Sequence, residues 1–229
     1  MEYAIEFGAP VTLPVAESTK PFPVGRIYCV GRNYAEHARE MGHDPDREPP
    51  FFFMKPADAI VPNGAAIPYP QVTKDLHHEI EMVVAIGKGG ADIPVEKALD
   101  HVFGYGVGLD MTRRDIQGEA KKMGRPWEMG KAFDNSAPCT DLKPVSMVGH
   151  PDKGAIWLKV NGKVVQKGDL SELIWNIPET ISYLSKLITL RPGDLIYSGT
   201  PAGVGPVNRG DKLEGHVEGV GDLVVTYAK

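Results

Sequence analysis

Two acidic residues, Glu79 and Glu81, stand one residue apart where a polar segment becomes an apolar one. The segment 76–87 reads LHHEIEMVVAIG, and its β-branched second half predicts a strand over about residues 78–86. Side chains alternate between the two faces of a strand, so both carboxylates should share a face, roughly 7 Å apart. Either they point into water, as strand acids usually do, or a hard divalent cation offsets their mutual repulsion.

A third acid, Asp110, follows a strand predicted over residues 102–109, in which glycine recurs at every second position from 104 to 108. Glycine repeated on one face indicates that another backbone or a ligand comes close. Magnesium-type sites use a few carboxylates and leave positions open for substrate. With Asp110 added, a metal site and a solvated acidic face are equally good interpretations. A zinc motif is not favoured, because Met82 stands where His-Glu-x-x-His needs its second histidine.

Two further candidates, His37 and Glu40, fall on a helix predicted over about residues 34–41, with Asn33 as its cap. Residues three apart share a helix face, and a histidine oriented by a carboxylate can act as a general base. A solvated surface pair is the commoner outcome of this spacing. The charged, proline-rich segment 43–50 that follows could close over a site as a lid. Lys131 lies in a predicted loop, where a lysine is usually solvated.

The remaining elements predict a β-rich fold with a few short helices. Residues 1–25 contain four prolines between short apolar pieces and form a lead-in to one large domain over residues 26–229. Asn161-Gly162 predicts a tight hairpin turn. Helices are predicted over about residues 94–100, 113–123 (capped by Thr112) and 178–187, and further strands over 27–30, 51–54, 156–160, 163–166, 195–197, 212–217 and 222–227.

Composition excludes several classes of protein. The net charge of −5, without a basic run, argues against a nucleic-acid partner. No stretch reaches 18 apolar residues and the N-terminus lacks an apolar signal region, so we expect no membrane association and a cytoplasmic location. Cys29 and Cys139 make no disulfide framework. Dinucleotide and phosphate-loop fingerprints do not occur, and Ser198 is not in a nucleophile elbow.

Six segments, in this order, resemble the fumarylacetoacetate hydrolase superfamily, near its acylpyruvase and fumarylpyruvate hydrolase branch. The resemblance covers the chain from about residue 25 onward and implies an α+β fold, a mixed β-roll core with flanking short helices, commonly as a homodimer. The segments are residues 31–40 (GRNYAEHARE), 53–56 (FMKP), 77–81 (HHEIE), 109–115 (LDMTRRD), 130–133 (GKAF) and 198–201 (SGTP).

The resemblance also implies a role for each candidate residue. A divalent cation, Mg²⁺ or Mn²⁺, would be held by Glu79, Glu81 and Asp110. His37 and Glu40 would form a dyad that activates water, and Lys131 would stabilise negative charge beside the metal. Contacts to the oxo-acid end of a small-molecule substrate would come from Arg114, Gln117 and Thr200.

The chemistry that follows is hydrolysis of a carbon–carbon bond in a 2,4-dioxo acid. Water activated by His37 attacks the 4-carbonyl, the bond between C3 and C4 breaks, and pyruvate leaves as its enolate. Fumarylpyruvate would give fumarate and pyruvate. Two alternatives remain: decarboxylation or tautomerisation of oxaloacetate, which uses the same enolate without attacking water, and a non-catalytic binding protein of the same fold.

Overall fold

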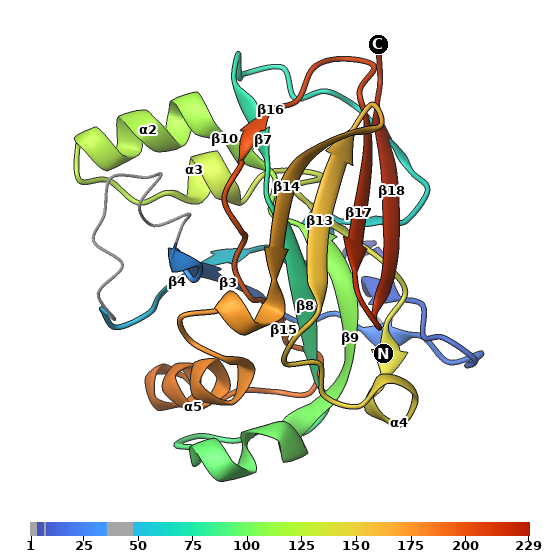
Figure 1. Ribbon diagram of the computed structural model, residues 1–229, viewed down its shortest axis with the longest axis vertical. Coiled ribbons are helices and arrows are strands. Elements are labelled where there is room, and N and C mark those ends of the chain that lie inside the picture. The colour runs from blue at the N-terminus through green and yellow to red at the C-terminus, as the bar shows by residue number, and fades with distance from the viewer. Residues whose placement is uncertain (1–3, 7, 36–47) are drawn as a thin grey trace.

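The computed structural model describes residues 4–6, 8–35 and 48–229 (Figure 1). The helix predicted over residues 34–41, with His37 and Glu40, therefore lies almost entirely outside the described residues, and so does most of the predicted lid. These two expectations stay predictions.

An eight-stranded mixed sheet forms the centre of the molecule (Figure 1). The order across the sheet is β4 (Phe51–Lys55), β3 (Ile27–Gly31), β15 (Leu195–Tyr197), β8 (Ile80–Ile86), β9 (Val102–Leu109), β11 (Ala137–Cys139) and β5 (Ile60–Pro62), with β12 (Lys143–Pro144) also on β9. Strands β15 and β3 pair in parallel, as do β11 and β5, and the other neighbours are antiparallel. In the ladder between the long strands β8 and β9, Glu81 lies opposite Gly108.

A second, five-stranded sheet packs against one face of the first. Alternate residues of β8, namely Ile80, Met82 and Val84, join side chains such as Leu158 and Leu213 of the second sheet in one buried apolar cluster. This pairing of curved sheets confirms the predicted β-rich roll. The order is β14 (Lys163–Asp169), β13 (Ala155–Val160), β17 (Lys212–Val217), β18 (Gly221–Tyr227) and β6 (Ala66–Ile67).

The hairpin between β13 and β14 turns at Asn161-Gly162, as predicted. Both residues have positive φ, 51° and 81°, which the two-residue turn requires.

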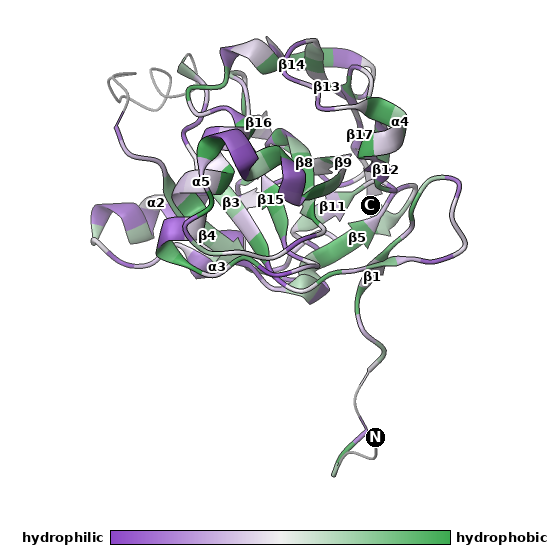
Figure 2. Ribbon diagram, turned by 90° about the horizontal axis from the view of Figure 1, so that it is seen from below, coloured by the Kyte–Doolittle hydropathy of each residue, from purple (hydrophilic) through white to green (hydrophobic). Residues whose placement is uncertain are grey.

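The opposite face of the large sheet is covered in part by the lead-in. Its hairpin, β1 (Thr12–Leu13) with β2 (Phe22–Pro23), contributes Leu13 and Phe22 to a second apolar cluster. That cluster includes Val83 and Ala85, the residues of β8 that alternate with those of the first cluster. Residues from both ends of the chain thus bury β8 on both faces. Figure 2 shows the apolar colouring along the central strands.

The strand predicted over residues 78–86 is in fact two strands that meet at Glu79. The first, β7 (Leu76–His78), belongs to a separate sheet with β10 (Thr112–Arg113) and β16 (Gly205–Pro206), and the second is β8. Gln166 holds the junction, because its side-chain oxygen contacts both the His78 ring (2.9 Å) and the Ile80 N–H (3.1 Å). The prediction of one continuous strand was wrong because a side chain distant in sequence fixes this change of sheet.

Short helices flank the sheets. Helix α5 (Ile177–Leu187) starts at Asn176, whose side chain and that of Glu179 cap each other's backbone N–H groups, with Pro178 in the first turn. The others are α2 (Arg114–Lys122), α3 (Glu128–Lys131), α4 (Val145–Val148) and the 3₁₀ helices η1 (Ala57–Ala59), η2 (Val95–His101) and η3 (Leu170–Glu172). Across the described ranges, no helix has the length and apolar character that a membrane crossing needs.

Two local predictions were wrong. Thr112 does not cap α2, because it pairs in β10 and its hydroxyl bonds to the backbone oxygen of Asp110 (3.2 Å). The strand over residues 51–54 was expected to be buried, but β4 is only half-buried, with Met54 41% exposed, because it forms an edge of the sheet.

Replacing Gly104 by alanine should destabilise the fold by about 1–3 kcal/mol, because the new Cβ would lie 2.3 Å from the backbone oxygen of Lys143 in β12. Gly118 in α2 is the matched control, since a Cβ there meets nothing within 4 Å. Gly118→Ala should stabilise by roughly 0.5–1 kcal/mol. Urea unfolding of both variants measures the difference, and equal stabilities would contradict the close packing at Gly104.

Candidate active site

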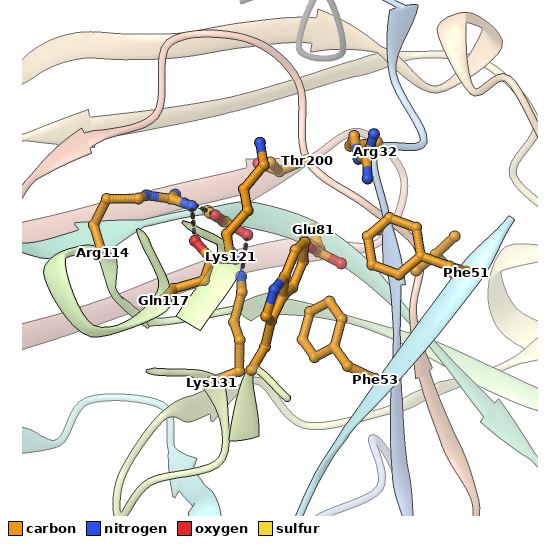
Figure 3. Close-up of a pocket in the computed structure, with 13 residues that line it drawn as sticks. Arg32, Phe51, Phe53, Glu81, Arg114, Gln117, Lys121, Lys131 and Thr200 are labelled. Atoms are coloured by element: carbon orange, nitrogen blue, oxygen red, sulfur yellow. Dashed lines mark hydrogen bonds and ion pairs between the residues drawn. The ribbon is translucent and has the colours of Figure 1, made fainter. Parts of the chain in front are cut away.

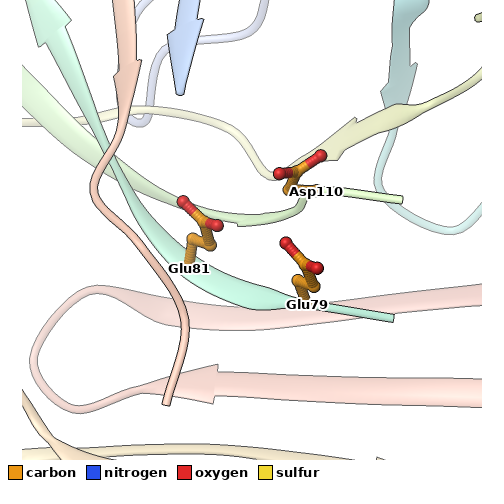
Figure 4. Close-up of side chains that lie close together, drawn as sticks. All are labelled: Glu79, Glu81 and Asp110. Carbon is orange, nitrogen blue, oxygen red and sulfur yellow. The ribbon is translucent and has the colours of Figure 1, made fainter. Parts of the chain in front are cut away.

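Three buried carboxylates meet where the large sheet adjoins β7. One oxygen from each of Glu79, Glu81 and Asp110 lies within 4.8 Å of the others (Figure 4). Backbone pairing sets this spacing, because the Asp110 N–H donates to the Glu79 carbonyl (2.9 Å) and Glu81 stands opposite Gly108. The structure thus brings together the three acids that the sequence singled out. His77 and His78 lie outside this cluster, as expected.

Lys131, the last residue of α3, is buried beside the cluster. Its ammonium group donates to Glu79 Oε2 (2.8 Å), Asp110 Oδ2 (2.6 Å) and Thr112 Oγ1 (2.6 Å). Burial lowers the pKa of Lys131, but the charges of Asp110 and Glu79 outweigh that effect and leave the pKa raised. The side chain is therefore a buried cation and not the solvated loop lysine that its sequence context favours.

A second buried lysine, Lys55, is not among the site residues that the sequence predicts. Its Nζ lies 2.9 Å from Asp110 Oδ1 and donates to the carbonyls of Met111 (3.1 Å) and Lys131. The available signal was a lysine that directly follows an apolar strand, within one of the segments that carry the family resemblance. Asp110 is thus bound by two ammonium groups, one on each oxygen.

Glu81 has a different environment from the other two acids. The N–H of Gly199 donates to its Oε2 (2.7 Å), but no cationic side chain of the described ranges forms an ion pair with it. Burial raises the pKa of Glu81, and the negative charges of Asp110 and Glu79 raise it further. A cation bound between the three carboxylates would offset this repulsion.

The loop that presents Gly199 is held by Asn33. The Asn33 amide donates to the carbonyls of Ser198 (2.8 Å) and Trp175 (2.9 Å), and its oxygen accepts from the Trp175 N–H (2.8 Å). Gly199 needs to be glycine, because φ is 101° and a Cβ would lie 2.6 Å from the Cβ of Asn33. Asn33 therefore positions the loop that contacts Glu81, a role that the predicted helix cap did not include.

The first turn of α2 carries the residues expected at the oxo-acid end. The Arg114 guanidinium forms an ion pair with Glu79 and donates to Gln117 Oε1 (2.7 Å) and His77 Nδ1 (3.3 Å). Burial lowers the pKa of His77, and the charge of Arg114 lowers it further. Thr200 accepts a bond from Gln166 Nε2 (2.8 Å). Arg114, Gln117 and Thr200 all line one pocket with Glu79 and Glu81 (Figure 3).

That pocket extends beyond the predicted residues. It opens between β3, β4, α2 and α3. Its other lining residues were not predicted as site residues from the sequence. They comprise Val30, Gly31, Arg32, Phe51, Phe53, Lys121 and Trp127, alongside Glu79, Glu81 and Lys131 (Figure 3). His37 and Glu40 lie outside the described residues, so their place relative to this pocket stays a prediction.

The residues present fit a hard divalent cation. Three carboxylate oxygens within 4.8 Å form an all-oxygen donor set of the kind that Mg²⁺ and Mn²⁺ prefer. The raised pKa of Glu81 marks a buried acid that such a cation would stabilise in its charged form. The part of the chain that the structure describes has no other cluster of this type.

The fold and this site define the class of the protein. Residues 26–227 match the family described as fumarylacetoacetate (FAA) hydrolase C-terminal. The chain belongs to the fumarylacetoacetate hydrolase family, which includes hydrolases and isomerases.

Three relatives illustrate the range of activities. The structure of fumarylpyruvate hydrolase from Pseudomonas aeruginosa, in complex with Mn²⁺ and pyruvate, is 56% identical, covers 99% of both chains and has a TM-score of 0.96. The mitochondrial oxaloacetate tautomerase FAHD1 of Homo sapiens is 47% identical over 89% of this chain and 91% of its own. The structure of a 5-carboxymethyl-2-hydroxymuconate delta-isomerase from Mycobacterium smegmatis is 35% identical. The match covers 91% of this chain and 80% of the isomerase chain, with a TM-score of 0.80.

Glu81→Gln should weaken Mn²⁺ binding by more than about 100-fold, since even changes outside the ligand shell typically cost 10- to 100-fold in affinity. The variant should fold, because it replaces a buried, repelled charge by a neutral group of the same shape. Titration calorimetry on protein stripped of metal measures the affinity. Glu119→Gln, at an exposed position of α2, is the control. Equal Mn²⁺ affinity in the Glu81→Gln variant and the wild type would show that the triad does not bind the metal.

Proposed function

We propose that the protein is a metal-dependent hydrolase of 2,4-dioxo acids that splits fumarylpyruvate into fumarate and pyruvate. One observation carries the proposal: a buried acidic triad lies between Arg114 and Lys131 in a pocket of a chain 56% identical to a fumarylpyruvate hydrolase. That relative holds Mn²⁺ and pyruvate. Glu79, Glu81 and Asp110 would hold Mg²⁺ or Mn²⁺, which supplies positive charge where the pyruvoyl end becomes negative.

Arg114 is suited to orient the oxo-acid carboxylate. An arginine has five N–H donors, and three interactions of Arg114 are directed at Glu79, Gln117 and His77. The remaining donors can bind a carboxylate while these contacts hold the guanidinium in place. Gln117 would fix the same end of the substrate from the next turn of α2.

Lys131 acts through its charge and not as a proton donor. All three of its N–H groups are directed at Glu79, Asp110 and Thr112, so none is left for the substrate without breaking one of these bonds. A fixed cation beside the carboxylates stabilises the enolate that develops when the C3–C4 bond breaks.

The water-activating step rests on His37 and Glu40. His37, oriented by Glu40, takes a proton from water, and the resulting hydroxide attacks the 4-carbonyl. The C3–C4 bond then breaks, the acyl group leaves as a carboxylic acid, and the pyruvate enolate takes up a proton at C3. The support for this pair is its place in the first family segment of the sequence.

A second candidate function is favoured by the identity to oxaloacetate tautomerase FAHD1, 47% over 203 residues. Tautomerisation moves a proton between C3 and the 2-oxo oxygen of oxaloacetate, and decarboxylation passes through the same enolate. Neither reaction needs an attacking water. The two candidates therefore share the triad, Arg114 and Lys131, and differ in their need for His37 as a base toward water.

The wild-type protein should hydrolyse fumarylpyruvate with Mg²⁺ or Mn²⁺ and lose this activity in EDTA, because the enolate charge is then uncompensated. Fumarylpyruvate, acetylpyruvate and oxaloacetate are assayed in parallel by the decay of their enol absorbance and by product chromatography. Glu79→Ala should be inactive, whereas Glu119→Ala on the exposed face of α2 should match the wild type. Full activity in EDTA or in Glu79→Ala would rule out the metal role.

His37→Ala separates the two candidate functions. Loss of the general base should lower kcat for fumarylpyruvate about 10²- to 10⁴-fold, whereas tautomerisation of oxaloacetate should keep most of its rate. His216→Ala, on the second sheet, where the ring pairs with Asp222, is the matched control. If the wild type turns over only oxaloacetate and His37→Ala preserves that rate, the tautomerase assignment replaces the hydrolase.

A further inference from the structure

The pocket has a second cationic end. Arg114 stands at one end, beside Glu79, and Arg32 stands at the other, next to the ring of Phe51 (Figure 3). Glu81 and Lys131 lie between these two ends. The proposed chemistry uses Arg114 and leaves Arg32 without a role.

Arg32 is held in place by an uncommon local structure. Its φ is 56°, in the left-handed region that few residues other than glycine adopt. Its guanidinium carbon lies 4.9 Å from the centre of the Phe51 ring. The preceding residue must be Gly31, because a Cβ there would lie 2.0 Å from Phe51 Cζ. The backbone conformation and the ring together direct the guanidinium into the pocket wall.

The guanidinium pairs with no acid in the part of the chain that the structure describes, whereas Arg26, Arg114, Lys55 and Lys131 are each paired. An arginine stacked on an aromatic ring keeps its in-plane N–H groups free for a planar anion. A carboxylate is the anion that this geometry fits.

The wall between the two cationic ends is aromatic. Phe51 meets Trp127 edge to face at 5.2 Å, and Phe53 lies 6.1 Å from the same Trp127 ring. Such a wall favours a flat, apolar segment of the ligand. The pocket therefore combines two cations on opposite sides with the carboxylates of Glu79 and Glu81 and an aromatic wall.

We propose that Arg32 binds a carboxylate at the far end of the acyl group, so that the enzyme selects acylpyruvates with a carboxylate at each end. The inference rests on the proposed function and deepens it, because it names the residue that separates a fumaryl group from an acetyl group. Fumarylpyruvate has an unsaturated, planar acyl chain that ends in a carboxylate, and acetylpyruvate lacks that carboxylate.

A binding experiment tests Arg32 without turnover. The probes are 2-oxoheptanedioate and 2-oxoheptanoate, which match fumarylpyruvate in chain length, lack the 4-oxo group that hydrolysis needs, and differ only in the distal carboxylate. With Mn²⁺ present, calorimetry on the wild type should give about 10- to 100-fold tighter binding of the dicarboxylate, as expected for a hydrogen bond between charged groups. Arg32→Met should abolish this preference, and Arg32→Lys should restore part of it.

The control variants isolate the charge of Arg32. Methionine and lysine must adopt the same left-handed backbone, so strain is held constant between the two variants. Arg209→Met removes an arginine that stacks on Tyr69 at 4.7 Å, far along the chain and outside this pocket, and should leave the preference intact. A preference that survives in Arg32→Met, or that is lost only in Lys121→Met, would overturn the proposal.

A kinetic arm separates this inference from the proposed function. In Arg32→Met, kcat/KM for fumarylpyruvate should fall about 10- to 100-fold while that for acetylpyruvate stays unchanged. If the wild type hydrolyses neither compound, the proposed function fails, and the calorimetric preference still decides whether Arg32 reads the distal carboxylate. If the wild type hydrolyses both and Arg32→Met lowers both equally, the function stands and the role of Arg32 fails.

Discussion

The burial of three carboxylates within 4.8 Å of one another is the constraint on which this structure depends. Like charges that are buried away from water repel each other strongly. Three cationic side chains, Lys131, Lys55 and Arg114, form ion pairs with Glu79 or Asp110 and offset this repulsion. Removing one partner of a buried pair typically costs about 3–5 kcal/mol, because the other charge is left uncompensated. These ion pairs therefore fix the positions of three elements around the acids: the end of β4, the end of α3 and the start of α2.

A sheet that is buried on both faces makes this arrangement possible. Even-numbered residues of β8, such as Met82, fill the core between the two sheets, and the odd-numbered Val83 and Ala85 pack against the lead-in. Glu81 continues the odd-numbered series, so it projects from the same face as Val83 and Ala85. The carboxylates therefore stand on or next to the buried central strands β8 and β9, while the aromatic wall comes from the edge strand β4 and the segment before α3.

Local patterns in the sequence predicted local structure well. The glycine-alternating strand over residues 102–109, the Asn161-Gly162 hairpin and helix α5 each carry their signal within a few residues, and the structure has them at those positions. The break at Glu79 was not predicted, because it depends on Gln166, and Lys55 was missed, because its ion pair joins it to Asp110, 55 positions further along the chain. The acids could be picked out by type and spacing, and Lys131 and Arg114 through the family resemblance, but the contacts of Lys55 and Asn33 could be found only in three dimensions. The aromatic and cationic far end of the pocket was likewise not predicted from the sequence.

The bond between Gly199 and Glu81 joins residues 118 positions apart, and β15 pairs with β8 through the same late segment. A chain growing from its N-terminus completes β8 and β9 long before residues 195–199 exist. Until then one edge of β8 has no neighbouring strand, and an open edge of this apolar kind invites pairing with other chains. A chain stopped before residue 195 would leave this edge of β8 open, and we expect it to aggregate and not remain as a stable partial domain.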